Sequence, residues 1–218
     1  DNTGTIEISS TGADTQLEIL FRGVTLTGHG QVVLSDNDGN VIFGGSVDTV
    51  LLNVDNTITG AGQLGAGQMT LVNEGTIIAS GSHALVVDTG SNVVTNDGTM
   101  ESTGSGGLII NGDLSNNGML WAHDGNITVA GNVSGNGSAL IEGSAQLEFG
   151  AASSENTTFA AIGDGTLKLD HAADYSGTVS GFNEGDRLLL SDLLVDANSP
   201  LVFAENQDGT GGLLTVSN

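Results

Sequence analysis

Apolar residues recur at one phase along most of the chain, and a glycine or asparagine opens each recurrence. We call this opening residue the reference position of a repeat. The references are Gly30, Asn56, Gly75, Gly98, Gly118, Gly137, Asn156 and Gly177. Their spacing of 19 to 26 residues indicates a structural repeat rather than a series of unrelated turns.

Two columns of residues after the reference are predicted to face inward. The column two places after it is apolar in all but one repeat: Val32, Ile58, Ile77, Met100, Leu120, Ala139, Thr158 and Val179. The column four places after it is mainly small: Leu34, Gly60, Ala79, Ser102, Ala122, Ile141, Ala160 and Gly181. Inward sites two residues apart are typical of a β-strand, so each repeat is expected to open with one.

Two further short strands follow within a repeat, as at residues 85–87 and 93–95. One such triplet cannot bury its apolar edge alone, but copies stacked at about 4.8 Å form a continuous core. We therefore predict an all-β fold, a single-stranded right-handed parallel β-helix (solenoid) with coils of about 19–26 residues. The rival architectures are a β-sandwich and a hairpin meander, which Asn-Gly turns favour locally.

The chain divides into three predicted parts. Residues 1–29 form an N-terminal cap or first coil, residues 30–182 the β-helix coils, and residues 183–218 a C-terminal cap or junction to further chain. Open ends of a β-helix expose unpaired strand edges, so Gln16–Gly23 and Asp186–Phe203, the most apolar terminal stretches, are the cap candidates. Since the sequence starts at Asp1 without Met, we expect a mature piece or an excised segment of a longer protein.

Asparagine repeats at the corners of consecutive coils. Asn73, Asn96 and Asn116 each lie two residues before a reference position. Stacked at strand spacing, their amides would bond one another in a ladder. The alternative is that each asparagine bonds only its own turn. We favour the ladder.

Composition and charge narrow the possible functions. The 218 residues include 35 Gly, one Pro and no Cys, which indicates a thin regular structure held without disulfides. The net charge of −23 repels phosphate backbones and anionic lipid surfaces, so nucleic-acid partners are not expected. No apolar run approaches the roughly 18 residues of a membrane span, so membrane insertion is not expected either.

One stretch of repeats is similar to a known family. The sequence Gly112–Ser144 resembles the roughly nineteen-residue repeats of filamentous haemagglutinin-like adhesins and autotransporter passengers, with their L-x-N-x-G-x-L-x-A pattern. The resemblance implies a right-handed β-helix in a large secreted bacterial protein, located outside the cell or on its surface. It also implies a role in attachment, biofilm or display. The variable coil lengths and the lack of a G-G-x-G-x-D nonapeptide set this chain apart from calcium-loaded repeats.

Candidate chemistry is sparse. Asp36 and Asp38 cluster carboxylates in the longest coil and are weak calcium candidates, because the spacing of an EF-hand loop and its distal Glu are absent. We therefore favour an exposed turn there and expect no cofactor.

Two histidines leave an enzyme as the alternative. Gly28-His29-Gly30 resembles one short motif of the polygalacturonases, but the accompanying acidic pair and R-x-K are not in their places. His123 and Glu142 are predicted to lie side by side in neighbouring coils, where an acid–base pair could act. An ordinary ion pair on the outer face of a sheet explains them better.

An apolar stripe interrupts the outward positions of three consecutive coils. It comprises Trp121, Leu140 and Phe159, with Met119 beside them and Glu101, His123 and Glu142 as polar neighbours. A contiguous apolar patch is either covered by the protein or marks a partner site. We expect the stretch Leu188–Leu194 to cover it; the alternative is a docking surface for a neighbouring chain or a sugar.

Together these patterns favour a non-catalytic, extracellular structural and adhesive segment. Its expected partners are a cell-surface glycan or protein, or further copies of itself. A glycan-processing enzyme, either lyase or hydrolase, is the first alternative. A self-assembling surface filament subunit is the second.

Overall fold

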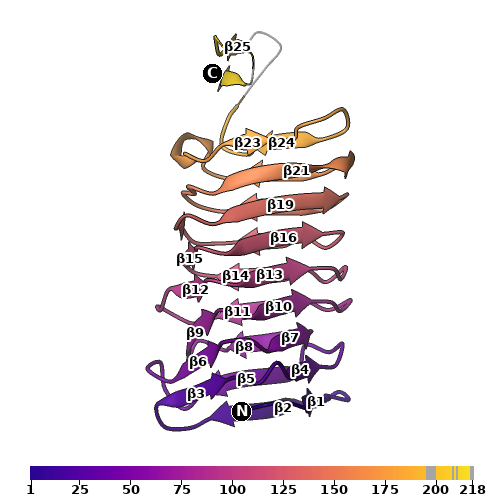
Figure 1. The fold of residues 1–218 in the computed structure, drawn as a ribbon, viewed down its shortest axis with the longest axis vertical. Coiled ribbons are helices and arrows are strands. Elements are labelled where there is room, and N and C mark those ends of the chain that lie inside the picture. The colour runs from indigo at the N-terminus through magenta and orange to yellow at the C-terminus, as the bar shows by residue number, and fades with distance from the viewer. Residues whose placement is uncertain (195–199, 208, 210, 217–218) are drawn as a thin grey trace.

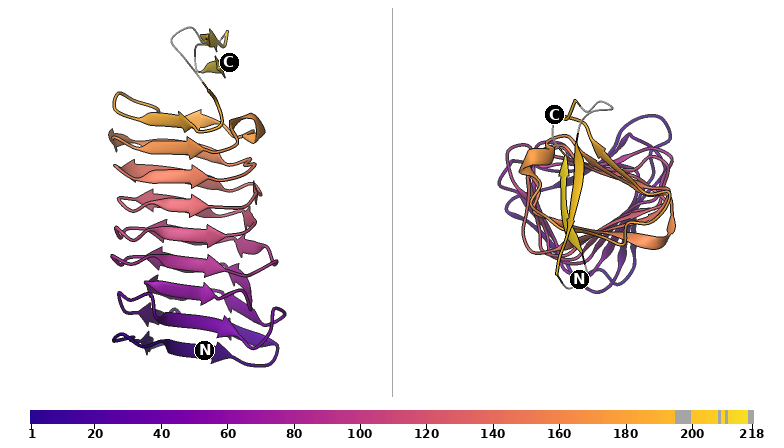
Figure 2. Two further views of the ribbon diagram at one scale, coloured as in Figure 1. Left: turned by 180° about the vertical axis from the view of Figure 1, so that it is seen from behind. Right: turned by 90° about the horizontal axis from the view of Figure 1, so that it is seen from above.

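A computed structural model describes residues 1–194, 200–207, 209 and 211–216. The chain winds as a parallel β-solenoid whose successive coils stack into a rod (Figure 1). Each complete coil contributes one strand to each of three sheets, here called A, B and C, and the three sheets enclose a roughly triangular core when seen along the rod (Figure 2). The predicted all-β parallel solenoid is confirmed.

Sheets A and B each contain nine parallel strands. Sheet A consists of β1 (Thr5–Ile8), β4 (Gln31–Leu34), β7 (Thr57–Gly60), β10 (Thr76–Ala79), β13 (Thr99–Ser102), β16 (Met119–His123), β19 (Ser138–Gly143), β21 (Asn156–Gly163) and β23 (Val179–Ser180). Sheet B consists of β2 (Thr15–Ile19), β5 (Asn40–Gly44), β8 (Gly62–Gly65), β11 (Leu85–Asp88), β14 (Leu108–Asn111), β17 (Ile127–Val129), β20 (Gln146–Phe149), β22 (Thr166–Leu169) and β24 (Arg187–Leu190).

Sheet C is shorter than the other two. Its six strands are β3 (Gly23–Leu26), β6 (Val50–Asn53), β9 (Thr70–Asn73), β12 (Val94–Asn96), β15 (Leu114–Asn116) and β18 (Val133–Ser134). In later coils it continues only as single bridges from Val133 to Ser153 and from Ser153 to Tyr175. A single 3₁₀ turn, η1 (Ala172–Asp174), is the helical structure among the described residues.

The core consists of the predicted inward columns for most of the rod. Ile58, Ile77, Met100 and Leu120 are fully buried one above another in sheet A. Large apolar side chains such as Leu64, Leu85 and Leu147 fill the same interior from sheet B. The alternation of buried and half-buried residues along each strand shows why a period of two was readable in the sequence.

The inward assignment is wrong in one coil. Ser153 bridges to Val133 and Asn156 already pairs with Ser138, so this corner is two residues shorter than the preceding one. Glu155 therefore takes the place predicted for Asn156. As a result Thr157 and Phe159 are buried, while Thr158 is exposed and Ala160 is half-buried, instead of lying inside as predicted.

The last coil also departs from the prediction. Val179 pairs with Thr157 rather than with Thr158, its predicted neighbour, and 38% of Val179 is exposed instead of lying inside. Gly181 is exposed too. Both residues lie in the outermost coil of sheet A, which has a neighbouring strand on one side only.

The Asn ladder exists and is longer than predicted. The side-chain amide nitrogens of Asn53, Asn73 and Asn96 donate to the amide oxygen of the next member at 2.9, 2.8 and 2.7 Å, and the series ends at Asn116. All four asparagines are fully buried. Asn53 escaped the sequence count because its corner contains one extra residue, which places it three residues before the reference Asn56 instead of two.

Corner side chains also connect neighbouring coils from outside the core. Carboxylates and amides accept backbone N–H groups of an adjacent corner, as Asp113 does from Asn132 at 2.8 Å and Asn156 from Thr178 at 3.0 Å. Asp36 reaches two coils further and accepts the N–H of His83 at 2.9 Å. These contacts explain why aspartate and asparagine are so frequent at the corners.

The two ends of the solenoid differ. At the first coil the core opens into an apolar cavity of about 390 Å³, lined by residues such as Ile6, Leu17 and Leu51. The cap candidate Gln16–Gly23 belongs partly to β2 and lines this cavity with Leu17 and Leu20, while Phe21 is 91% exposed. At the other end β24 pairs with β22, so regular pairing extends to Leu190, past the predicted boundary at residue 182.

An antiparallel hairpin lies beyond the last coil. It consists of β25 (Leu201–Glu205) and β26 (Gly212–Val216), and it follows residues 195–199, which fall outside the described part of the predicted C-terminal cap (Figure 1). None of the helices in the described residues is long and apolar enough to cross a membrane.

Candidate functional site

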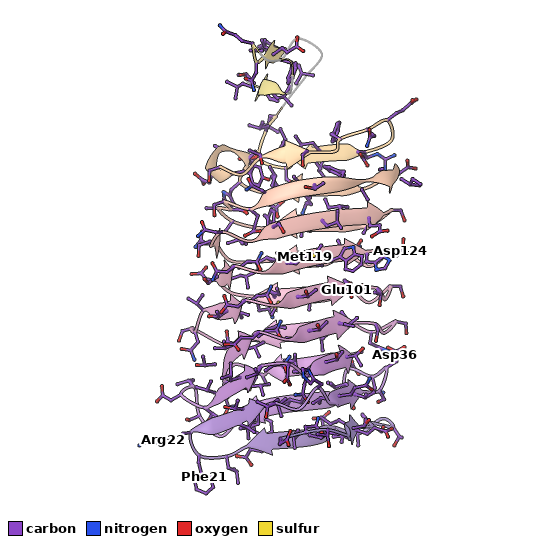
Figure 3. All side chains as sticks on the ribbon, viewed as in Figure 1. Phe21, Arg22, Asp36, Glu101, Met119 and Asp124 are labelled. Carbon is purple, nitrogen blue, oxygen red and sulfur yellow. The ribbon has the colours of Figure 1, made fainter. Side chains whose placement is uncertain are left out.

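Six of the residues predicted to form a contact surface lie together on the outer face of sheet A. We call this set the Trp121 wall; it consists of Glu101, Met119, Trp121, His123, Leu140 and Glu142. All six are half-buried. Strand register brings them together, because Trp121 lies between Glu101 and Leu140, while His123 lies beside Glu142. Figure 3 shows Met119 and Glu101 on neighbouring strands of this wall.

The indole of Trp121 is fixed in two directions. Its Nε1–H donates to Glu142 Oε2 at 3.0 Å in the next coil. Its ring lies parallel to the imidazole of His123, with a centroid separation of 4.4 Å and an interplanar angle of 2°. A side chain held in this way has little rotational freedom left to lose when it binds a partner.

His123 is held by the coil on the other side. Its Nδ1 lies 2.7 Å from Glu101 Oε1. That hydrogen bond raises the pKa of His123; burial opposes the rise, and the charges of Glu142, Glu101 and Asp124 add to it. A charged imidazolium against the face of an indole is a favourable cation–π arrangement. Because the pKa is raised on folding, this contribution to stability is complete below the unfolded pKa of histidine and is lost as pH rises through the folded pKa.

Phe159 does not belong to the surface, contrary to the prediction. It is 2% exposed, packs in the core and meets Phe182 edge-on at 5.3 Å. The outward neighbour of Leu140 is Thr158 instead. The cause is the offset of 18 residues between paired residues of β19 and β21, one fewer than predicted, which shifts every side chain of β21 by one position and so to the other face of the sheet.

The predicted covering segment is also elsewhere. Leu188, Leu189 and Leu190 lie in β24, which pairs with β22 in sheet B. Leu194 is 86% exposed. Within the described residues, therefore, Leu188–Leu194 leaves the Trp121 wall uncovered.

The contacts within the Trp121 wall fit a surface for binding a partner better than they fit a catalytic acid–base pair. His123 and Glu142 are neighbours in the strand register as predicted, but the closest carboxylate contact of His123 is with Glu101. Glu142 instead accepts the indole N–H. Two hollows in the described chain are lined by residues of the first coils, such as Leu17 and Val24, several coils away from Trp121.

The other sequence candidates lie at separate corners. Asp36 accepts the Ser82 hydroxyl at 2.7 Å as well as the His83 N–H, and the His83 N–H bond in particular holds the pKa of Asp36 well below its usual range. Asp38 is exposed nearby. Among residues placed by the structure, no three His, Cys, Asp or Glu side chains converge as a metal site.

His29 lies at an exposed corner in a left-handed conformation, with φ of 57°. Its backbone N–H donates to Asp55 Oδ1 at 3.0 Å, and its imidazole Nδ1 is 3.6 Å from Asp55 Oδ2. The backbone bond from His29 lowers the pKa of Asp55. This geometry makes His29 a corner residue that links two coils.

One chemically unusual residue escaped the sequence analysis. Glu155 is only 1% exposed, and its Oε2 accepts the side-chain amide of Asn116 at 3.0 Å. Its Oε1 is buried with no hydrogen-bond partner. The missed signal was the pattern Thr157-x-Phe159, since placing the large Phe159 inward aligns it with Ile141 and moves Glu155 to the corner.

Searches of this chain against protein-family models, curated proteins and solved structures found no match.

Proposed function

We propose that this chain is a non-catalytic structural and adhesive segment of a large bacterial surface or secreted protein, working outside the cell in attachment, biofilm or matrix. The continuous core and the Asn ladder support the structural part, because the core runs through successive coils and the ladder joins four of them from Asn53 to Asn116. The similarity of Gly112–Ser144 to adhesin repeats supports the extracellular location. The expected partner is a cell-surface glycan or protein.

One observation carries the adhesive part of the proposal. The indole of Trp121 remains at the surface although its N–H is already bonded to Glu142 and its ring is stacked on His123. An aromatic ring fixed on a flat and regular wall is suited to contact with a partner, because little entropy is lost on binding. Met119 and Leu140 extend the half-exposed apolar area beside it.

A bead-retention experiment tests this function. Beads carrying the folded protein are passed over surfaces coated with neutral, acidic or amine-bearing polysaccharides and over bacterial and host cells. We expect retention on at least one surface, and we expect Trp121→Ala to reduce it severalfold. Ile109→Ala is the matched control, because Ile109 is a half-buried outward residue on sheet B.

The same samples test the enzyme alternative, in which His123, whose Nδ1 lies 2.7 Å from Glu101 Oε1, would act as the acid or base. Soluble polysaccharides are incubated with the protein and assayed for new reducing ends. The proposal predicts retention of beads without release of reducing ends. Cleavage that disappears in His123→Gln would replace it with a glycan-processing activity.

The filament alternative has its own supporting observation. The apolar cavity at the first coil and the exposed Phe21 beside β2 offer a surface for another molecule. Light scattering over a range of protein concentrations separates this alternative, since a filament subunit grows in mass with concentration and an adhesive rod keeps a constant mass.

A further inference from the structure

One outward residue per coil forms a straight column along the rod. Ile78, Glu101, Trp121 and Leu140 pair in successive strands of sheet A. Neighbours in such a column are about 4.8 Å apart, which is the separation of paired strands. This distance is close to the length of one sugar residue in an extended glycan. A linear polysaccharide lying along the rod would therefore meet about one side chain per sugar.

The charges around the column select the kind of glycan. Glu101, Glu142 and Asp124 surround a single histidine on the wall. Among the described residues, the second carboxylate oxygens of Glu101 and Glu142 make no hydrogen bond, so both can accept one from a ligand. The chain as a whole has 26 acidic residues against three Lys and Arg, and it therefore repels anionic polymers.

We propose that the Trp121 wall binds a linear amine-bearing polysaccharide, such as a polymer of glucosamine, with one sugar stacked on the indole of Trp121 and ammonium groups at Glu101 and Glu142. This inference rests on the proposed adhesive function and names its ligand class. The stacked indole supplies an apolar and electron-rich face, which attracts both the C–H side of a sugar and a nearby cation. The free carboxylate oxygens supply charge-assisted hydrogen bonds.

A basic protein segment matches the charges less completely. Lysine or arginine side chains would satisfy the two carboxylates, but an extended peptide does not present a flat apolar face to each coil in turn. The one-per-coil column favours a sugar chain. Oligolysine is therefore included in the test as a competing ligand.

The test measures binding of four oligomers to the purified chain: glucosamine, N-acetylglucosamine, galacturonate and lysine. Trp121 is the only tryptophan, so its fluorescence reports contact at the wall directly, and calorimetry gives the affinity. In mildly acidic buffer of low ionic strength we expect the glucosamine oligomer to bind about tenfold more tightly than the N-acetylated oligomer, or ~1.4 kcal/mol. Added salt should reduce this preference.

Two variants assign the binding to the wall. Trp121→Ala should abolish it. Glu142→Gln should keep an acceptor for the indole N–H and remove the charge, and so reduce the preference for glucosamine severalfold. Ile109→Ala and Glu74→Gln, an exposed corner residue, should bind like the wild type. Thermal unfolding of every variant separates lost binding from lost folding.

Each outcome distinguishes this inference from the adhesive function. Equal or tighter binding of the N-acetylated oligomer overturns the amine assignment and leaves the adhesive function standing. Tighter binding of oligolysine that is unchanged in Trp121→Ala has the same consequence. If beads adhere but no oligomer binds, the inference fails alone. If the glucosamine oligomer binds but beads adhere nowhere, the inference stands and the adhesive function fails. If neither occurs, both fail.

Discussion

Glu155 places a carboxyl group in the buried interior, where the other side chains are apolar or uncharged. It occupies the corner position held by Asn116 two coils earlier, and between them Gly135 has no side chain to continue the ladder. The longer side chain of Glu155 crosses this gap to reach Asn116. Burial is the larger influence on its carboxyl group and raises its pKa, although the bond from Asn116 opposes the rise.

Stability should therefore decrease as pH rises through the titration of Glu155. The folded chain holds the proton of Glu155 more tightly than the unfolded chain does. The stability that the protonated carboxyl contributes is therefore complete below the ordinary pKa of 4.5, and it is lost as pH rises through the raised pKa of the folded chain. Glu155→Gln keeps an acceptor for Asn116 and cannot ionise. We expect the variant to become more stable than the wild type as pH rises, by about 1–3 kcal/mol.

Denaturant unfolding at a series of pH values measures this difference. Glu74→Gln, at an exposed corner, is the control and should show no such trend. If the wild type instead gains stability relative to Glu155→Gln as pH rises, Glu155 works as a charged acceptor and the assignment is wrong.

At the scale of strands and ladders, buried amides connect coils that apolar contacts alone would leave free to slide along each other. Asn96 stands in the middle of the ladder: it accepts from Asn73 and donates to Asn116. Removing its side chain leaves the side-chain oxygen of Asn116 without its donor inside the core, while the amide nitrogen of Asn73 keeps the carbonyls of Gly75 and Thr99. A buried polar group left unpaired costs about 1–3 kcal/mol.

We expect Asn96→Ala to lower the free energy of unfolding by about 2–5 kcal/mol, because two ladder bonds are lost at once. Denaturant unfolding followed by circular dichroism gives the value. Asn111→Ala is the matched control, since Asn111 is exposed at the end of β14 and should change stability by less than about 0.5 kcal/mol. Equal effects of the two substitutions would contradict a cooperative ladder.

The strand pattern was predictable from sequence where corners have constant length. Leu120 and Ile77 were assigned inward from spacing alone, and both are fully buried. The pattern failed at Phe159 because Asn156 pairs with Ser138, 18 residues earlier, whereas the predicted repeat there has 19 residues. This shift of one residue exchanges the faces of the next strand, and turn-forming residues on both sides hid the change. Register placed His123 beside Glu142, but side-chain rotamers determined that His123 bonds Glu101, which spacing does not encode.

For the whole molecule, the net charge of −23 is spread along a narrow rod. Like charges at this density repel one another in the folded chain more than in the expanded unfolded chain. We therefore expect the midpoint of thermal unfolding to rise by several degrees as sodium chloride is added from low ionic strength, because ions screen the repulsion.

Differential scanning calorimetry over a salt series measures this shift. Sodium chloride and potassium chloride should act alike if screening is the cause. A midpoint that responds only to a divalent cation would point instead to specific binding, with Asp36 and Asp38 as the first residues to substitute.

The one-coil register has a consequence for how the chain acquires its structure. Ladder partners such as Asn73 and Asn96 are 23 residues apart, and Asn96 and Asn116 are 20 apart, wherever along the rod they lie. Contact order therefore does not grow with the length of the rod, and each finished coil provides the edge on which the next can form. Folding can advance coil by coil as the polypeptide emerges from a ribosome or a narrow pore, so a much longer chain built on this plan need not fold more slowly per coil.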